Sequence, residues 1–549
     1  MIQKLSSTRC GVAAAALASM SIACAARIDP SRPIYPMPET RAEVTNYNQT
    51  SSYGDVIAFI NGLRSRNAPL AFGVIGKTTE GRDIPYLIAS RPMVTTPEEA
   101  RRLGRPIVYV NANIHAGEVE GKEALLALVR DLTYQHGPNV LDSLVLIAVP
   151  IYNADGNEKF ADQTVNRTEQ NGPTLVGRRP NGQNLDLNRD YVKAEAPETR
   201  AALAMFNKWD PDVYVDLHTT DGSFHGFVLT YSPSLNPAAY APGFAGALTR
   251  DGMLPEIRAR MHARGFEVFD YGNFDSIYEE RDITDTVKRG WFTYEHKPRY
   301  GTNYYGMRGR VSILSEAYSH DPFKRRVAST YAFVHELLSD AARHSADLQR
   351  IRTTAETVDE QDVPIRSRLT TKPFDAPIPF EILRRTGDSA RTQAGVPNGV
   401  KRTARFITQV MPVYDRFEPS LSISHPDAYA LPNDSAIVAN LRLHGLTVTP
   451  LSSLPAASRA AVFTVDSVIP AERPFQGHRE TRLTGHWSAP SSSDVPTRGG
   501  YVVVSASGRF GPLAAYLLEP ESDDGLVDWN FFDTALKPGK PFPVIRLYK

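Results

Sequence analysis

The chain has very little cysteine. Of its 549 residues only Cys10 and Cys24 carry a thiol, and both precede residue 27. The rest of the sequence therefore has no disulfide and no thiolate to serve as a nucleophile or a metal ligand. This excludes cysteine-dependent hydrolases and Cys-ligated zinc sites from residues 27–549.

The sequence also lacks an excess of charge of either sign, because 61 Lys and Arg residues balance 61 Asp and Glu residues. Nucleic acids and anionic membranes attract chains with surplus positive charge, so neither is predicted as a partner. No run of 18 or more apolar residues follows the first 26 residues. We therefore expect no transmembrane span.

The first 26 residues have the pattern of a secretory signal peptide. Lys4 and Arg9 precede an alanine-rich apolar run at 11–23, and small residues follow it. Such a segment is too short to span a bilayer and is removed after export. We expect cleavage after residue 25 and favour it over a lipid anchor at Cys24. The protein is then expected in the periplasm or outside the cell.

Strands and helices alternate between residues 52 and 347. Apolar runs predict strands, and amphipathic patterns predict helices. The strands fall at 70–75, 84–88, 106–114, 143–150, 212–217 and 310–314, and the helices at 52–63, 120–134, 197–209, 255–263 and 322–347. This alternation predicts an α/β fold with a mixed, mainly parallel sheet flanked by helices, in a domain over residues 27–355.

The pattern changes after about residue 355. Short β-like runs interrupted by Pro, Ser and Gly replace the alternation, with one helix at 435–444. The runs fall at 379–383, 405–410, 461–465, 482–487 and 500–505. We predict a smaller β-rich domain over residues 370–549.

The most informative motif is HAGE at 115–118, between a predicted strand and a predicted helix. His115 and Glu118 are three residues apart, so an imidazole and a carboxylate can bind one ion at roughly 2.0 to 2.2 Å. His218 also follows a strand, and open α/β sheets place their sites beyond the carboxyl ends of the strands. Two histidines and a glutamate leave a coordination position open, which is typical of a catalytic zinc site.

Several motifs occur in one order along the chain. They are GKTTEGRD at 76–83, HAGE at 115–118, NADG at 153–156, LDLNRD at 185–190 and ILSEAY at 313–318. With these motifs, residues 52–340 resemble the zinc carboxypeptidase A family. The chain looks like an exported bacterial member with an additional C-terminal β-rich region. The resemblance implies one zinc ion per chain, held by His115, Glu118 and His218.

The resemblance also implies roles for the LDLNRD motif. Asn188 and Arg189 match the pair that binds the free carboxylate of a peptide's terminal residue, a task suited to the planar guanidinium group. Asp186 matches a carboxylate that orients a zinc-binding histidine, here His115.

Three further roles follow from the resemblance. Glu316 matches the general base. An arginine of GRRPNG at 177–182 matches the group that polarises the scissile carbonyl, and we choose Arg179 over Arg178. A tyrosine covers the substrate in this family, and four tyrosines compete for that place. The spacing to Glu316 favours Tyr294, whereas NYYGMRGR at 303–310 looks more like a site loop, and we choose Tyr305. The other two candidates are Tyr300 and Tyr304.

The activity implied is hydrolysis of the C-terminal amide bond of a peptide with a free carboxylate, by zinc-activated water with a glutamate base. Two alternatives stay open. The same zinc and carboxylate-binding pair would serve an amidohydrolase of cell-wall peptides or acylated amino acids. The chain could also be a peptidase-like binding protein that has lost activity. The loop at 219–226 and the C-terminal region differ from the animal enzymes, so strict terminal-residue specificity is not implied.

Overall fold

The structure is a computed structural model that describes residues 37–274, 284–355, 362–387, 395–453, 458–496 and 500–549. Residues from Met37 to Lys549 form one compact unit. The predicted signal peptide, with Cys24, lies outside the described residues. Among the described helices, none is both long enough and apolar enough to cross a bilayer.

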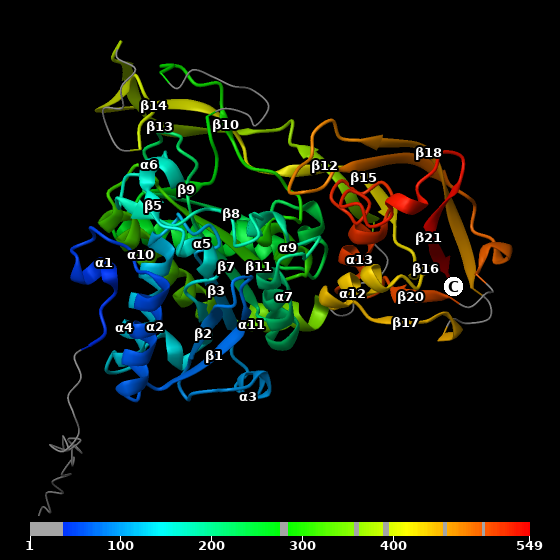
Figure 1. Cartoon of the computed structure of the whole chain (residues 1–549), viewed down its shortest axis with the longest axis horizontal. Helices are drawn as coiled ribbons and strands as arrows, with labels where there is room; N and C mark the ends of the chain where they lie inside the picture. The colour runs from blue at the N-terminus through cyan, green and yellow to red at the C-terminus, as the bar shows by residue number, and fades with distance from the viewer. Residues whose placement is uncertain (1–36, 275–283, 356–361, 388–394, 454–457, 497–499) are drawn as a thin grey trace, which may run out of the picture. The chain divides into compact units, whose positions relative to one another are not determined.

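The centre of the unit is an eight-stranded mixed sheet with the strand order β1-β2-β4-β3-β7-β11-β8-β9 (Figure 1). The neighbours β4/β3, β3/β7, β7/β11 and β8/β9 run parallel, and the other three pairs run antiparallel. This is the mixed, mainly parallel sheet that the sequence predicts. The strands are β1 (Leu70–Lys77), β2 (Asp83–Ala89), β3 (Ile107–Ala112), β4 (Val145–Val149), β7 (Val213–Thr219), β8 (Leu229–Pro233), β9 (Val268–Asp270) and β11 (Val311–Ala317).

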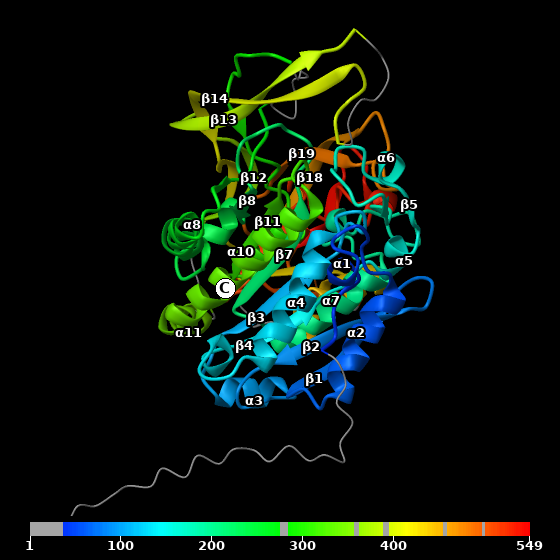
Figure 2. The same ribbon diagram turned by 90° about the vertical axis from the view of Figure 1, so that its left-hand side faces the viewer.

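Helices cover both faces of this sheet (Figure 2). The apolar sides of α2, α4, α8, α10 and α11 share a core with one face, and those of α7 and α9 share a core with the other. The helices are α1 (Arg41–Val44), α2 (Tyr53–Ser65), α3 (Pro97–Arg102), α4 (Glu120–Tyr134), α5 (Ala154–Asn157), α6 (Gln163–Asn166), α7 (Pro197–Trp209), α8 (Leu254–Ala263), α9 (Gly301–Met307), α10 (Phe323–Arg343) and α11 (Ser345–Thr354).

The C-terminal region is rich in strands, as predicted. A six-stranded antiparallel sheet has the order β17-β20-β16-β21-β18-β19, and β12 pairs with β15. Two helices, α12 (Ser435–Leu443) and α13 (Gly511–Leu518), accompany them. The strands are β12 (Asp362–Leu369), β13 (Phe374–Arg385), β14 (Val400–Tyr414), β15 (Phe417–Ser424), β16 (Ala428–Pro432), β17 (Val448–Pro450), β18 (Arg459–Pro470), β19 (Thr481–Trp487), β20 (Tyr501–Ser505) and β21 (Pro541–Tyr548).

The two regions share one hydrophobic core. It includes Tyr109 and Tyr214 on the central sheet, Phe206 on α7, and Tyr429 and Leu513 from the C-terminal region. The backbone also connects them, because the short strand β10 (Trp291–Phe292) pairs in parallel with β14. Burial of apolar surface across this junction stabilises both regions together. The boundary between residues 355 and 370 stays a prediction.

Candidate active site

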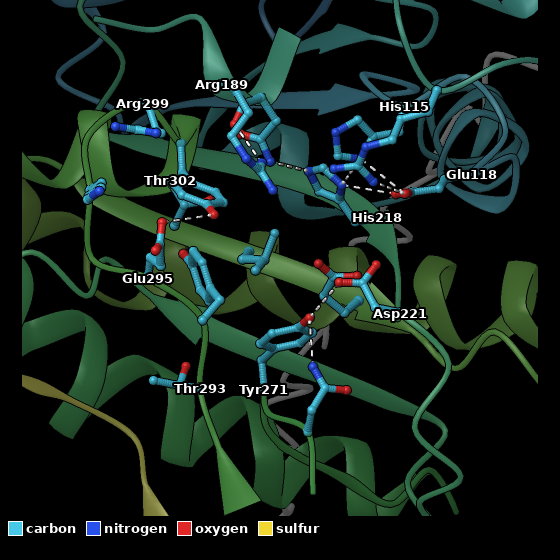
Figure 3. Close-up of a pocket in the computed structure, with 18 of the residues that line it drawn as sticks. His115, Glu118, Arg189, His218, Asp221, Tyr271, Thr293, Glu295, Arg299 and Thr302 are labelled. Carbon is cyan, nitrogen blue, oxygen red and sulfur yellow. Dashed lines mark hydrogen bonds and ion pairs between the residues drawn. The ribbon is translucent and has the colours of Figure 1, made fainter. Parts of the chain in front are cut away.

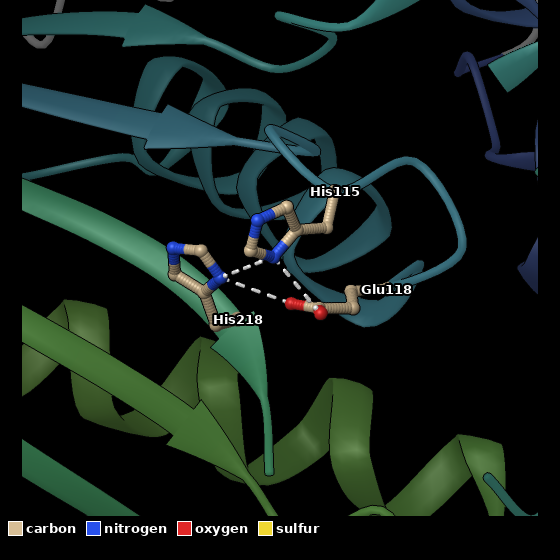
Figure 4. A group of neighbouring side chains, drawn as sticks. All are labelled: His115, Glu118 and His218. Atoms are coloured by element: carbon tan, nitrogen blue, oxygen red, sulfur yellow. Dashed lines mark hydrogen bonds and ion pairs between the residues drawn. The ribbon is translucent and has the colours of Figure 1, made fainter. Parts of the chain in front are cut away.

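Three donor side chains meet where β3 and β7 end (Figure 4). His115 and Glu118 lie in the turn after β3, and His218 lies near the end of β7. Nδ1 of His115 is 3.0 Å from one Glu118 oxygen, and Nδ1 of His218 is 3.0 Å from the other. The two Nδ1 atoms are 3.2 Å apart, and all three side chains are buried. The structure thus brings the three predicted ligands together.

The opposite nitrogen of each histidine faces a carboxylate. Nε2 of His115 is 3.0 Å from Asp186, and Nε2 of His218 is 3.0 Å from Asp216. A carboxylate accepts a hydrogen from Nε2, so each neutral ring turns the lone pair of Nδ1 toward Glu118. With both rings neutral, three electron-pair donors face one another, and they repel unless a proton or a metal cation lies between them. A tetrahedral zinc ion with bonds of about 2.0 to 2.1 Å separates its donors by about 3.3 Å, so this donor set fits zinc.

The pKa shifts of the donor side chains also indicate that a cation is favoured between them. Burial alone would raise the pKa of Glu118, but Arg167 and His115 hold it well below its usual value. Burial alone would lower the pKa of His218, but Asp216 and Glu118 raise it well above its usual value. Without a metal, the carboxylates around the site therefore favour a proton on the imidazole, and a bound dication would satisfy the same negative charge.

Arg179 lies beside the donors. Its Nε donates to Asp186 at 2.9 Å, and its Nη1 is 3.4 Å from Glu118. Burial alone would lower the pKa of Arg179, but Asp186 and Glu118 raise it, so the guanidinium stays charged. Arg179 lines the cavity described below, whereas Arg178 is not among the lining residues described. Of the two candidate arginines, Arg179 is therefore the one that lies at the cavity.

The NADG and GRRPNG segments hold this arginine in place. Asn153 donates to the backbone oxygens of Ile114 and Arg179, at 3.1 and 3.0 Å, and so joins the two turns. Gly177 permits a close backbone approach, because a Cβ there would lie 2.7 Å from the oxygen of Ala116. Asn153 and Gly177 therefore support the site by holding its backbone turns together.

Glu316 lies on β11, in register with His218 on the neighbouring strand β7. It is buried, and its Oε2 has no hydrogen-bond partner among the described residues. Burial, followed by Glu118 and Asp221, raises its pKa well above the usual value, although His218 opposes the shift. The predicted strand ended at residue 314, but β11 continues to Ala317, so the backbone ladder fixes Glu316. A buried carboxyl group of this kind is suited to accepting and returning a proton.

Asn188 and Arg189 lie in a short turn after Asp186, and both line the cavity. The guanidinium of Arg189 lies 3.9 Å over the centre of the Tyr300 ring and donates to the backbone oxygen of Asn188 at 2.8 Å. The Asn188 side chain accepts from the backbone nitrogen of Gly301 at 2.8 Å. The aromatic face orients the guanidinium and leaves further N–H groups for a carboxylate.

These side chains line one cavity of about 600 Å³ (Figure 3). Of the predicted site residues, only Asp186 and Tyr305 are not among its lining residues. Asp186 lies behind His115 and contacts it, as an orienting group should. The cavity also takes residues from the C-terminal region, namely Arg473, Pro474, Phe475 and Glu480.

The choice of Tyr305 needs correction. The segment expected to be a site loop is the helix α9, and Tyr305 is 1% exposed on it. Its ring stacks on Phe206 with centroids 3.6 Å apart and lies 4.2 Å from Tyr214, so it belongs to the hydrophobic core. Tyr294 and Tyr300 line the cavity instead, and Tyr294 has the spacing to Glu316 that the family favours.

Sequence reasoning missed two charged residues of the site. Arg167 is buried with its Nη1 3.1 Å from Glu118, and no local pattern identifies it. Asp216 is buried on β7, two residues before His218. Side chains two residues apart on a strand share a face, and a lone acid in an apolar strand signals a polar partner. That signal was available in VYVDLH.

A second group of possible metal donors occurs among the described residues, formed by Glu256, Asp340 and His344. Asp340 is already paired with Arg260 and with Arg343. Its charge is thus neutralised, and the group is better described as an ion-pair network.

Comparisons with known proteins agree with this geometry. Residues 56–238 match the profile of a family described as zinc carboxypeptidase. Carboxypeptidase 2 of Trichophyton rubrum is 26% identical over 163 residues, covering 29% of this chain and 27% of the relative. Carboxypeptidase M of Mus musculus is 30% identical over 181 residues, covering 31% and 36%. The chain thus spans about a quarter to a third of the length of these curated relatives.

Among solved structures, a metallo-carboxypeptidase from Burkholderia cenocepacia has a TM-score of 0.38 and 16% identity, covering 53% of this chain and 69% of that chain. The three donors, Arg179, Asn188 and Arg189 all fall within the matched segment, and Glu316 lies beyond it. Residues 56–238 are thus similar to the zinc carboxypeptidase family over about a third of the chain.

Proposed function

We propose that the protein is an exported zinc carboxypeptidase that hydrolyses the C-terminal amide bond of peptides. One observation carries the proposal. A single cavity contains three converging metal donors, a buried carboxyl group beside them, and an Asn/Arg pair suited to a terminal carboxylate. This combination matches the needs of metal-assisted amide hydrolysis.

Each of the site residues has its own proposed role in the hydrolysis. His115, Glu118 and His218 would hold zinc, which supplies a Lewis acid and lowers the pKa of water. Arg189 and Asn188 bind the terminal carboxylate and so place the scissile bond. Arg179 donates to the carbonyl oxygen as negative charge develops on it. Glu316 takes a proton from the attacking water and returns it to the leaving amine.

Export is the part of the proposal that rests on the sequence. The basic start, the short apolar run and the small residues up to residue 26 support secretion. The scarcity of cysteine leaves the exported protein without disulfides, so its stability would come from packing and ion pairs. Expression with and without residues 1–26, followed by fractionation, tests this part.

The carboxylate-binding role of Arg189 is tested by comparing the hydrolysis of a peptide that has a free C-terminal carboxylate with that of its C-terminally amidated form. Amidation of the C-terminus removes the charge that Arg189 would bind, and charge-assisted hydrogen bonds contribute about 1.5 to 3 kcal/mol. We expect kcat/KM to fall by about 10- to 100-fold for the amidated peptide. The measurement is steady-state hydrolysis of one peptide in both forms, and mass spectrometry identifies the peptide bond that is hydrolysed.

A matched variant makes this test specific. Arg189→Met should lower kcat/KM for the free peptide and leave little difference between the two forms, because the same contact is lost from the protein side. Equal rates on both peptides with the unmodified enzyme would contradict the carboxylate-binding role of Asn188 and Arg189.

A further inference from the structure

A loop of the C-terminal region reaches the active-site cavity. It comprises residues 471–480, between β18 and β19, and we call it the 471–480 loop. Arg473, Phe475 and Glu480 of this loop line the cavity. The loop lies more than 200 residues beyond the segment that matches the zinc carboxypeptidase family. It therefore adds to the site from outside the family match.

The tip of the loop is a tight turn with an unusual residue. Phe475 and His478 exchange two backbone hydrogen bonds, at 2.7 and 2.9 Å, so Gln476 and Gly477 are the two central residues. Both have positive φ, +49° and +83°. Turns of this kind favour Asn or Gly at the first central position, because most larger side chains are strained there. The choice of Gln suggests a reason outside the turn.

The side chain of Gln476 supplies that reason. Its Oε1 accepts a hydrogen bond from the backbone nitrogen of Asp186 at 2.9 Å. The carboxylate of Asp186 in turn contacts Nε2 of His115, accepts from the backbone nitrogen of Asn188 and accepts from Nε of Arg179, at 3.0, 2.9 and 2.9 Å. One hydrogen bond thus fixes the backbone from which three site residues are oriented.

The rest of the loop is anchored, so that Gln476 has a defined position. Nε2 of His478 contacts Glu195 at 2.8 Å. Glu480 pairs with Arg299 at 2.5 Å, and Arg299 also donates through Nε to Asp524 at 2.8 Å. Asp524 and Arg299 are buried, which makes this pair costly to break. The loop is therefore held at both sides of its turn.

We propose that Gln476 is a positioning residue of the active site, which acts through Asp186 on the metal-binding histidine and on the carboxylate-binding turn. The C-terminal region thereby completes the site rather than merely covering it. The proposal rests on the proposed function for its kinetic effect, but its effect on zinc binding is measured without any substrate.

Two variants of the full-length chain distinguish loss of the hydrogen bond between Gln476 and Asp186 from a change in the turn at 475–478. Gln476→Asn suits the turn better but is one methylene shorter, so its amide no longer reaches Asp186. Gln476→Met keeps the length but offers no strong acceptor. We expect each to weaken zinc affinity about 10-fold, at the lower end of the range for residues that support metal ligands, and to lower kcat similarly. Tm should be compared between metal-free chains, because weaker zinc binding by itself lowers the Tm of the loaded chain.

The measurements are zinc affinity by competition with a chromophoric chelator, steady-state kinetics and thermal unfolding. Gln476→Glu keeps an acceptor of the same length and should retain zinc affinity. Glu472→Gln is a matched control, because Glu472 is exposed on the same loop and is not among the residues that line the cavity. It should leave all three readouts unchanged.

The outcomes are distinct. Unchanged zinc affinity and kcat in both Gln476→Asn and Gln476→Met would overturn the positioning role and leave the proposed function standing. Loss of affinity in Gln476→Asn without any loss in Gln476→Met would also overturn it, because removal of the acceptor alone would then have no effect. Failure of the unmodified chain to bind zinc would refute the proposed function, and the positioning role with it.

Discussion

Replacement of Glu316 by glutamine is expected to lower kcat/KM by about 10²- to 10⁴-fold, the usual range for loss of a general acid–base group. The amide has nearly the same shape, so the cavity should keep its form. It cannot accept a proton from water or return one to the leaving amine. Glu316 is buried, and its Oε2 has no hydrogen-bond partner among the described residues, so the substitution breaks no hydrogen bond of that oxygen.

The test of Glu316→Gln requires that folding and metal content stay normal. Zinc should remain stoichiometric, because the three donors are untouched, and Tm should not fall. Tyr305→Phe is a suitable control, since that ring is buried in the core and is not among the residues that line the cavity. Undiminished turnover in Glu316→Gln would reject the assignment of the base. An unmodified chain that binds zinc and peptide without turnover would instead support the inactive binding protein.

Replacement of His218 by alanine is expected to have the second large effect. It removes one of three donors, and the imidazole leaves a gap between Glu118 and Asp216. Loss of a group that merely supports a ligand costs about 10- to 100-fold in metal affinity, so loss of the ligand itself should exceed that range. Activity should fall with zinc occupancy. Metal analysis after dialysis against a chelator measures the occupancy.

The matched comparison is Asp216→Asn, which keeps His218 but weakens the acceptor at its Nε2. Zinc affinity should fall in this variant by about 10- to 100-fold, less than in His218→Ala. Zinc affinity is therefore predicted to decrease from the unmodified chain to Asp216→Asn, and further to His218→Ala. Full zinc occupancy in His218→Ala after chelation would contradict the ligand assignment. Added zinc should restore activity to the unmodified chain after the same treatment.

Much of the fold could be predicted from the sequence, because apolar patterns and residues typical of helix ends agreed with one another. The bounds of α4 and α7 match the predictions, since an apolar stripe marks each helix and Pro197 suits the first turn of α7. The convergence of the three candidate metal donors could be predicted for a topological reason. His115 and His218 both lie at the carboxyl ends of strands, and neighbouring parallel strands bring such positions together.

The parts that were missed depend on long-range packing. Tyr305 lies in a Gly- and Asn-containing segment that resembles a loop, yet stacking on Phe206 and Tyr214 places it on a core helix. Arg167 and Gln476 reach the site from segments whose sequences carry no chemical signature. Gln476 accepts a hydrogen bond from a backbone nitrogen 290 residues earlier in the chain. Because the donor is a backbone group, the residue type at that position gives no sign of the contact. Tertiary structure alone supplies such information.

The register between β7 and β11 has one further consequence. His218 and Glu316 are direct partners across these strands, so their backbones lie one strand spacing apart, about 4.8 Å, with the proposed zinc ligand beside the proposed base. A slip by a single residue would turn one of the two to the opposite face of the sheet. Correct pairing of β7 with β11 therefore places the proposed zinc ligand and the proposed base side by side, and a one-residue slip would separate them.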